Sequence, residues 1–270
     1  MTEPCPRMRK HRFFVGGAGH FARGCKCAMQ LTVFGNNATC PQALGACSCF
    51  LVQAGGKRIL LDMGCASLTQ LQRWVDLKQL DLIVISHLHF DHFGDLFCAK
   101  YQLETRAALG EQIPVLPLCS PALPPWARRE LLEGGVFRHT VMQDGQSLRL
   151  DGAALTFYRV PHLVESYAVR LCAEGKTLAY SGDSAACDAL VQAARGADCF
   201  LCEASLVQGQ QQQAGHHLMA GDAGRLAAQA GAKRLLLTHY HPGRRQAVLE
   251  QARAAFAAAQ LTQIGERYEI

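Results

Sequence analysis

The stretch Ser86–Asp95, SHLHFDHFGD, places three of the chain's eleven histidines within six positions, with an aspartate between two of them. The apolar segment LDLIVI directly precedes it and predicts a buried strand. Residues two apart on an extended strand point the same way, so His87 and His89 can bind one ion together. Asp91 and His92 follow where the backbone turns toward a helix, and they can reach a second ion. Imidazole and carboxylate ligands without thiolates favour a catalytic metal site over a closed structural one.

From Met29 onward, short apolar strands alternate with turns and then with amphipathic helices. Two apolar runs around Gly55 and Gly56 predict a hairpin with a tight turn. Each half of the chain begins with strands and continues with alternating helices and strands. This order predicts an α/β fold of two sheets packed face to face with helices outside. The expected helices cover residues 67–80, 96–109, 124–134, 186–194, 220–230 and 244–259.

The bulk composition narrows the class of protein. The 270 residues carry a net charge of +5, which permits an anionic substrate but is too small to indicate nucleic acid by itself. No window reaches the roughly 18 apolar residues of a membrane span. Among thirteen cysteines, Cys25-x-Cys27 and Cys199-x-x-Cys202 have metal-binding spacing, but no second pair stands at zinc-finger spacing. We therefore expect reduced thiols, a cytoplasmic location and no membrane partner.

The domain organisation follows from where regular patterning begins. Residues 1–28 are basic and glycine-broken, and we expect a disordered extension or an upstream start with Met29 as the natural beginning. Residues 29–270 are expected to form one compact domain. The polar run at 208–215, QGQQQQAG, predicts a surface loop.

A two-metal site needs more ligands than the first cluster provides. Three later apolar strands each end on one candidate: FYRVPH ends at His162, TLAYSGD at Asp183 and RLLLTH at His239. A lone histidine or aspartate at a strand end is usually a turn residue, but the carboxyl ends of strands in one sheet gather ligands. Together these residues predict a site with two metal ions.

HLHFDH, the earlier ILLDMG, and the three strand-end residues resemble the five-part signature of the metallo-β-lactamase superfamily. The last third, CEASL followed by HHLMAGDAGRLAAQAGAKRLLLTH, resembles the ribonuclease Z-like branch. The resemblance implies a four-layer αββα sandwich with a binuclear zinc site, for which Mn²⁺ or iron could substitute. It assigns His87, His89 and His162 to one zinc, Asp91, His92 and His239 to the other, Asp183 as the bridge, and Asp62 as a structural residue rather than a ligand.

The same resemblance implies hydrolysis by a metal-activated hydroxide, with Asp91 holding or deprotonating the attacking water. The leaving group then requires a proton. His217, which opens the helix LMAGDAGRLAAQA, matches the proton donor proposed for that branch, and His216 is the competing residue. His241 either lines the pocket or lies in a surface turn.

The chain departs from ribonuclease Z in two places. Only a strand, a turn and a strand separate His162 from Asp183, which leaves no room for the arm that clamps tRNA. The histidine that usually precedes EA is replaced by Cys202. The leading hypothesis is therefore a zinc-dependent phosphodiesterase that acts on a small or cyclic nucleotide or on short RNA. The alternatives are a tRNA 3′-processing endonuclease, a mononuclear-iron sulfur or redox enzyme, and a non-catalytic metal-binding partner protein; a homodimer is expected from the resemblance alone.

Overall fold

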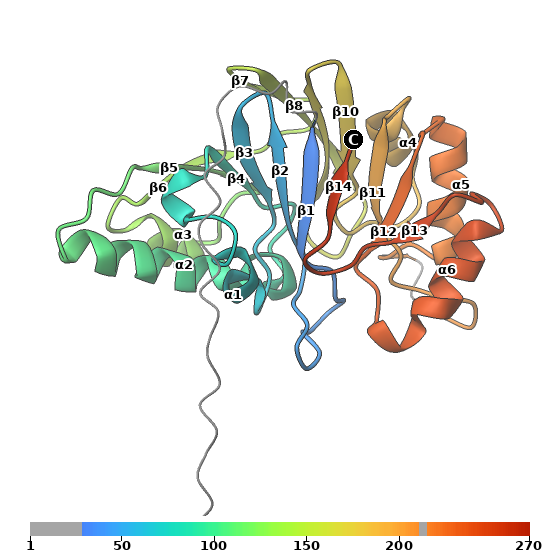
Figure 1. The fold of residues 1–270 in the computed structure, drawn as a ribbon, viewed down its shortest axis with the longest axis horizontal. Coiled ribbons are helices and arrows are strands. Elements are labelled where there is room, and N and C mark those ends of the chain that lie inside the picture. The colour runs from blue at the N-terminus through green and yellow to red at the C-terminus, as the bar shows by residue number, and fades with distance from the viewer. Residues whose placement is uncertain (1–28, 211–214) are drawn as a thin grey trace, which may run out of the picture.

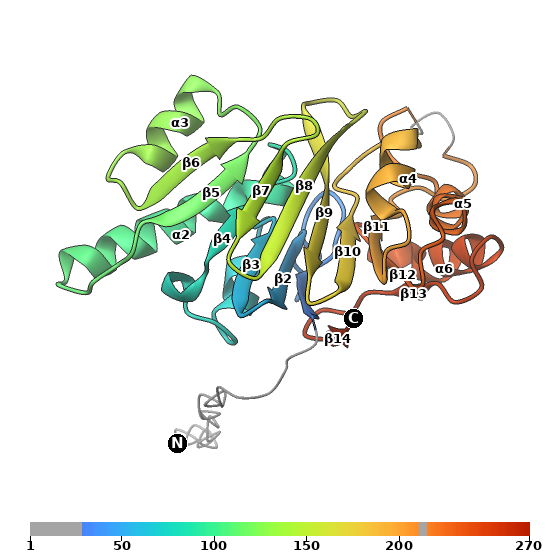
Figure 2. The same cartoon turned by 90° about the horizontal axis from the view of Figure 1, so that it is seen from above.

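A computed structural model describes residues 29–210 and 215–270. Two seven-stranded sheets pack face to face, and helices cover the outer face of each sheet (Figure 1, Figure 2). The predicted four-layer αββα sandwich is thus confirmed. The expected disorder of residues 1–28 and the middle of the predicted loop at 208–215 lie outside the described residues.

The N-terminal sheet is mixed, and one of its edge strands comes from the C-terminal end of the chain. Its order is β14 (Arg267–Glu269), β1 (Gln30–Gly35), β2 (Cys49–Ala54), β3 (Lys57–Leu61), β4 (Leu82–Val84), β5 (Leu116–Ser120) and β6 (Phe137–Val141). Strands β3 to β6 are parallel, whereas β2 pairs antiparallel with both of its neighbours. Its outer face is covered by α1 (Ser67–Leu71), α2 (Phe90–Ala108) and α3 (Pro125–Leu132).

The second sheet mirrors the first. Its order is β13 (Gln260–Leu261), β12 (Leu235–Thr238), β11 (Cys199–Glu203), β10 (Lys176–Tyr180), β9 (Ser166–Ala173), β8 (Ala153–Val160) and β7 (Ser147–Leu150). Strands β10 to β13 are parallel, and β9 runs antiparallel to β8 and β10. Its outer face is covered by α4 (Asp188–Ala194), α5 (Ala220–Ala230) and α6 (Arg245–Arg253).

Three apolar clusters hold the layers together. The central one joins the inner faces of both sheets, and Phe50 there lies against Tyr180 with ring centroids 5.3 Å apart. The other two lie between each sheet and its own helices. Alternation along strands explains the division, because successive side chains point to opposite faces. Cys199 accordingly faces the central cluster and Cys202 the helical one, so the two thiols cannot bind one metal ion.

Three helix predictions were wrong in length. The helix expected at 96–109 begins at Phe90 and ends at Ala108. The helix expected at 67–80 ends at Leu71, and a separate 3₁₀ turn follows at Leu77–Gln79. The carboxylate of Asp76 caps that turn by accepting a hydrogen bond from the backbone N–H of Lys78, which favours a new start over a continuous helix. The last helix, expected at 244–259, covers only Arg245–Arg253.

The segment between the third histidine and the next aspartate is a plain antiparallel hairpin. Strands β9 and β10 pair residue by residue around a turn at Glu174 and Gly175. All of residues 162–183 are described, and no arm is inserted there. Among the described helices, none has the length and apolar character needed to cross a bilayer.

Candidate metal centre

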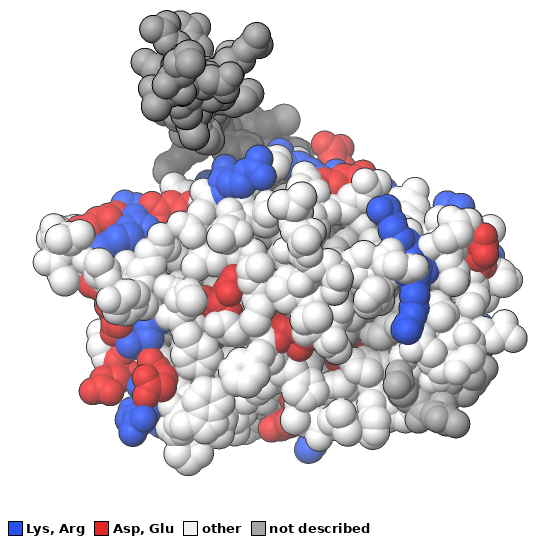
Figure 3. Space-filling model, turned by 90° about the horizontal axis from the view of Figure 1, so that it is seen from below, with Lys and Arg blue, Asp and Glu red and all other residues white. Residues whose placement is uncertain are grey.

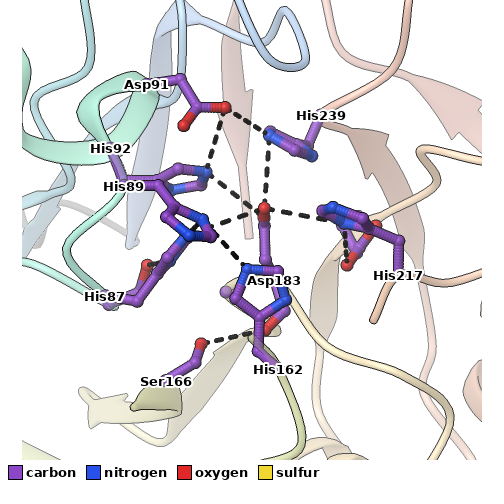
Figure 4. Close-up of polar contacts among 12 residues, drawn as sticks. His87, His89, Asp91, His92, His162, Ser166, Asp183, His217 and His239 are labelled. Atoms are coloured by element: carbon purple, nitrogen blue, oxygen red, sulfur yellow. Dashed lines mark hydrogen bonds and ion pairs between the residues drawn. The ribbon is translucent and has the colours of Figure 1, made fainter. Parts of the chain in front are cut away.

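The seven predicted metal ligands converge at the edge where β4, β8, β10 and β12 end (Figure 4). This edge faces the viewer in Figure 3, where the middle of the face carries mostly uncharged side chains. His87 and His89 follow β4, Asp91 and His92 lie in the first turn of α2, His162 follows β8, Asp183 follows β10, and His239 follows β12.

Three histidines form the first group. His89 Nδ1 lies 3.1 Å from His87 Nε2 and 3.1 Å from His162 Nε2. Two nitrogens bound to one tetrahedral zinc, each at 2.0–2.1 Å, lie about 3.3 Å apart. The spacing of these three ring nitrogens therefore fits one cation.

The second group contains Asp91, His92 and His239. Asp91 Oδ2 lies 3.1 Å from His239 Nε2 and 3.9 Å from His92 Nε2. Asp183 lies between the two groups: its Oδ2 is 3.8 Å from His87 Nε2 and 3.4 Å from His239 Nε2, while its Oδ1 is 3.3 Å from His92 Nε2. A carboxylate in that position can face two cations at once.

Two atoms at the centre lack hydrogen bonds although they are buried. His92 Nε2 and Asp183 Oδ1 have no hydrogen-bond partner among the described residues. An unsatisfied buried polar atom costs about 1–3 kcal/mol, and more when charged. Both atoms belong to ligands of the groups above, so a bound cation would satisfy them. The residues present fit a pair of divalent metal ions.

The outer ring nitrogens fix the histidines in the orientation that metal binding requires. The Nδ1 atoms of His87, His92, His162 and His239 lie within 3.1 Å of an oxygen outside the group, and each can donate to it. That proton position leaves Nε2 unprotonated and directed at the centre. Burial lowers the pKa of His87 and of His162, which further favours the neutral imidazole.

Asp62 lies behind the ligands rather than among them. Its Oδ2 accepts hydrogen bonds from His92 Nδ1 (2.7 Å), Ser86 Oγ (2.9 Å) and the hydroxyl of Tyr180 (2.6 Å). Ser86 Oγ in turn lies 3.1 Å from His87 Nδ1, so one carboxylate supports a histidine of each group. Asp62 and His239 have left-handed backbones (φ 59° and 51°), a conformation that non-glycine residues adopt mainly at constrained sites.

A close backbone contact holds the start of α2 against the loop after β3. A Cβ added to Gly64 would lie 1.9 Å from the carbonyl oxygen of Asp91. Only glycine therefore allows this approach, which sets the position of the Asp91 side chain.

The side chain of His217 lies beside Asp183. The side chain of His216 is exposed, and only the carbonyl oxygen of His216 contacts a candidate ligand, by accepting a hydrogen bond from His162. His217 Nδ1 lies 3.2 Å from Glu203 Oε1 and 3.7 Å from Asp183 Oδ2. Burial opposes the charged imidazole, but the hydrogen bond and charge of Glu203 prevail and raise the pKa of His217 to about 9. Of the two candidates, His217 alone directs its side chain at the metal ligands.

Sequence reasoning missed three supporting residues. Glu203 is fully buried at the end of β11 and accepts hydrogen bonds from Ser205 and from the backbone of Ser184. Ser205 Oγ also lies 2.8 Å from His239 Nδ1. Glu203 is the last residue of β11 and Tyr180 the last residue of β10, and neither position carries a signal that distinguishes it from an ordinary strand end.

A cavity of about 350 Å³ opens beside His217 and His239. Its walls include the apolar side chains of Leu163 and Leu206 and the exposed Arg244. His241 also lines this cavity, and its Nδ1 accepts a hydrogen bond from the N–H of Gly243 in a 3₁₀ turn. His241 therefore both lines the cavity and lies in a surface turn.

Comparison with known proteins identifies the family to which this chain is similar. The family model described as "Beta-lactamase superfamily domain" matches residues 57–240. The "Probable metallo-hydrolase YhfI" of Bacillus subtilis is 30% identical over 229 residues, which cover 84% of this chain and 94% of the relative. A "Ribonuclease Z" of Archaeoglobus fulgidus is 27% identical over 272 residues, covering 78% of this chain and 86% of the relative.

Solved structures extend the comparison to the fold. The crystal structure of YhfI superposes with a TM-score of 0.84 at 28% identity and covers 90% of this chain and 100% of that one. A "New Diphosphatase from the PhnP Family" superposes with a TM-score of 0.69 at 21% identity and covers 90% and 98% of the two chains. At that identity the second likeness concerns the fold alone.

Proposed function

Because the chain belongs to the metallo-β-lactamase superfamily, we propose that it is a metal-dependent phosphodiesterase with two zinc ions, acting on a small or cyclic nucleotide or on short RNA. The observation that carries the proposal is the convergence of two ligand groups on Asp183, with His217 beside them. A metal-binding protein without catalytic function would have no use for a histidine held against the site by a buried glutamate.

The first group, His87, His89 and His162, would hold one zinc ion, and the second, Asp91, His92 and His239, the other, with Asp183 between them. When bound, two such ions act as Lewis acids toward the phosphoryl group and lower the pKa of a water molecule toward 7. The absence of thiolates from both groups is typical of catalytic sites.

The chain's own residues supply positioning and proton transfer. Asp91 Oδ2, 3.1 Å from His239 Nε2, is the group to hold the attacking water and accept its proton. His217 is the group to protonate the leaving oxygen, because Glu203 engages Nδ1 and leaves Nε2 without a hydrogen bond inside the described part of the chain. A carboxylate that orients a catalytic imidazole in this way is a recurrent arrangement.

Two features support a small substrate. The cavity of about 350 Å³ lies at the small end of the usual range for small-molecule sites, and Arg244 at its wall offers a cation for an anionic group. The short β9–β10 hairpin leaves no element in the position of the tRNA-binding arm, which argues against tRNA 3′ processing. The name of one similar protein, a ribonuclease Z, denotes cleavage at phosphorus and supports the reaction class.

The test measures metal content together with hydrolysis of bis-p-nitrophenyl phosphate. We expect about two zinc ions per chain in the wild type, and loss of both full occupancy and activity in Asp183→Ala. Asp151→Ala, which changes an exposed carboxylate in the turn between β7 and β8, is the matched control and should behave as wild type. One iron ion per chain with no turnover would refute the proposal and favour sulfur or redox chemistry.

A further inference from the structure

A group of aromatic side chains lies next to the metal centre on the side of α2 and α3. Phe90 stands between the ligands His89 and Asp91 in the chain and is 61% exposed. Trp126, in the first turn of α3, is 47% exposed. The two exposed rings form one small apolar patch beside the candidate active site, which is a suitable place for a ligand to bind.

These rings are held in a fixed arrangement. Phe90 stacks on the buried Phe93 with centroids 5.5 Å apart and an interplanar angle of 20°. Trp126 stacks on Phe97 at 5.8 Å and 16°. The two exposed rings are themselves 6.3 Å apart. We call Phe90, Phe93, Phe97 and Trp126 the aromatic platform.

The platform and the cavity lie on opposite sides of the ligands. The platform is carried by α2 and α3 of the N-terminal sheet, whereas the cavity beside His217 is lined by loops that follow strands of the second sheet together with Ala38 and Thr39. Helices α2 and α3 lie at the opposite end of the molecule from α5 and α6 (Figure 1). A phosphodiester has two ester groups. If the leaving group is the one nearest His217, the retained ester group points toward the aromatic platform.

We propose that the aromatic platform stacks the base of the nucleoside that stays attached to phosphorus, an inference that rests on the proposed phosphodiesterase function. Every nucleobase offers a flat π face, and stacking on an aromatic side chain does not depend on base sequence. Phe90 is bonded directly to two ligand residues, and adjacent Cα atoms lie about 3.8 Å apart. The backbone of Phe90 therefore lies beside the metal centre, so that a base one sugar away from a phosphoryl group bound there would be within reach of the exposed ring.

A second copy of this chain is the competing occupant, and the available area argues against it. One large aromatic side chain buries about 150–250 Å². At exposed fractions of 61% and 47%, the two rings offer roughly 200 Å² between them. A stable interface needs about 800 Å² on each partner. The aromatic platform is large enough for a base and too small to sustain a dimer by itself.

The test compares two substrates with the same leaving group on the zinc-loaded protein: thymidine 5′-(p-nitrophenyl phosphate) and methyl p-nitrophenyl phosphate. The ratio of their kcat/KM values reports the contribution of the base. In Phe90→Leu and in Trp126→Leu, each measured separately, we expect this ratio to fall about tenfold relative to wild type. Tyr101→Leu, which removes a 74% exposed ring further along α2, is the matched control and should leave the ratio unchanged.

The outcomes separate this inference from the proposed function. An unchanged ratio, with both substrates hydrolysed, would overturn the inference and leave the phosphodiesterase intact. The same unchanged ratio accompanied by conversion of a dimer to a monomer, measured by light scattering, would identify the aromatic platform as a contact between copies. Failure of the wild type to hydrolyse either substrate would overturn the proposed function and this inference with it.

Discussion

Removal of one buried hydroxyl, in Tyr180→Phe, should weaken metal binding without touching a ligand. The Tyr180 hydroxyl donates a hydrogen bond to Asp62 Oδ2 at 2.6 Å. Asp62 also accepts a hydrogen bond from His92 and is connected to His87 through the hydroxyl of Ser86. Burial and the charge of Asp62 raise the pKa of Tyr180 well above its usual value, so the hydroxyl remains a donor across the accessible pH range.

The magnitude follows from what the substitution removes. Phenylalanine keeps the ring packed on Phe50 and leaves no unpaired donor, since only the hydroxyl is lost. A hydrogen bond to a charged group contributes about 1.5–3 kcal/mol to the free energy of unfolding. For a domain of this size that is a fall in Tm of about 3–10 °C. Loss of a group that orients ligand histidines typically weakens metal affinity 10–100-fold, and we expect about tenfold because Asp62 retains its other donors.

Two assays check this prediction. Differential scanning calorimetry of the metal-free protein gives the change in Tm, and Co²⁺ titration followed by visible absorption gives metal affinity independently of turnover. Tyr158→Phe is the matched control, because the half-buried Tyr158 hydroxyl makes no hydrogen bond within residues 29–210 and 215–270. If Tyr180→Phe binds Co²⁺ as tightly as the control and melts at the same temperature, the Asp62 network does not position the ligands.

Three further results are expected. His217→Gln should lower kcat roughly 10²–10⁴-fold while leaving metal content unchanged, and His216→Gln should have little effect on kcat; equal losses in both would refute the assignment of the proton donor. Chelation should lower the Tm, with recovery on adding Zn²⁺, because a ligand present at 100 times its Kd stabilises the folded state by about 2.7 kcal/mol. Hydrogen bonds from Arg106 lower the pKa of Glu111 from 4.5 to about 2, so this contribution to stability is complete above the unfolded pKa and is lost as pH falls toward 2. Thermal melts across that range should therefore show the Tm of Arg106→Gln converging on that of the wild type at acidic pH, and a constant gap would contradict the argument.

The convergence of the candidate metal ligands was predictable from sequence because each occupies a position close to a strand end or a helix start. His87 and His89 were expected on an extended segment, but β4 ends at Val84 and the chain bends there, although the two ring nitrogens still lie 3.1 Å apart. Helix α2 begins at Phe90, so the next two candidate ligands follow on helical geometry. His162, Asp183 and His239 each end an apolar strand, and parallel strands bring their carboxyl ends to one edge. The layered fold was predictable for the same reason, since periodicity and strand order are local properties of the chain.

The supporting residues could not be found in that way, because their roles depend on pairing between distant strands. Glu203 reaches His217 only because β11 lies parallel to β10 and because the loop before α5 returns over the end of β11. Tyr180 reaches Asp62 across 118 residues of sequence, from one sheet to the other through the central core. Neither contact leaves a periodic signal, since a glutamate after an apolar strand and a tyrosine within one are common in unrelated proteins.

The exposure of the aromatic platform could not be predicted from the sequence for the same reason. Phe90, Phe93 and Phe97 follow the i, i+3, i+7 spacing of an ordinary buried helix face, and that pattern predicts core. In the structure the face is split: Phe93 is buried, whereas Phe90 turns to solvent beside the ligands and meets Trp126 from α3. The packing around α2 covers Phe93 but not the first residue of the helix, so the exposure of Phe90 depends on tertiary contacts that the sequence pattern does not show. If the proposed function holds, the position between His89 and Asp91 is one where substrate preference can change while the candidate ligands stay fixed.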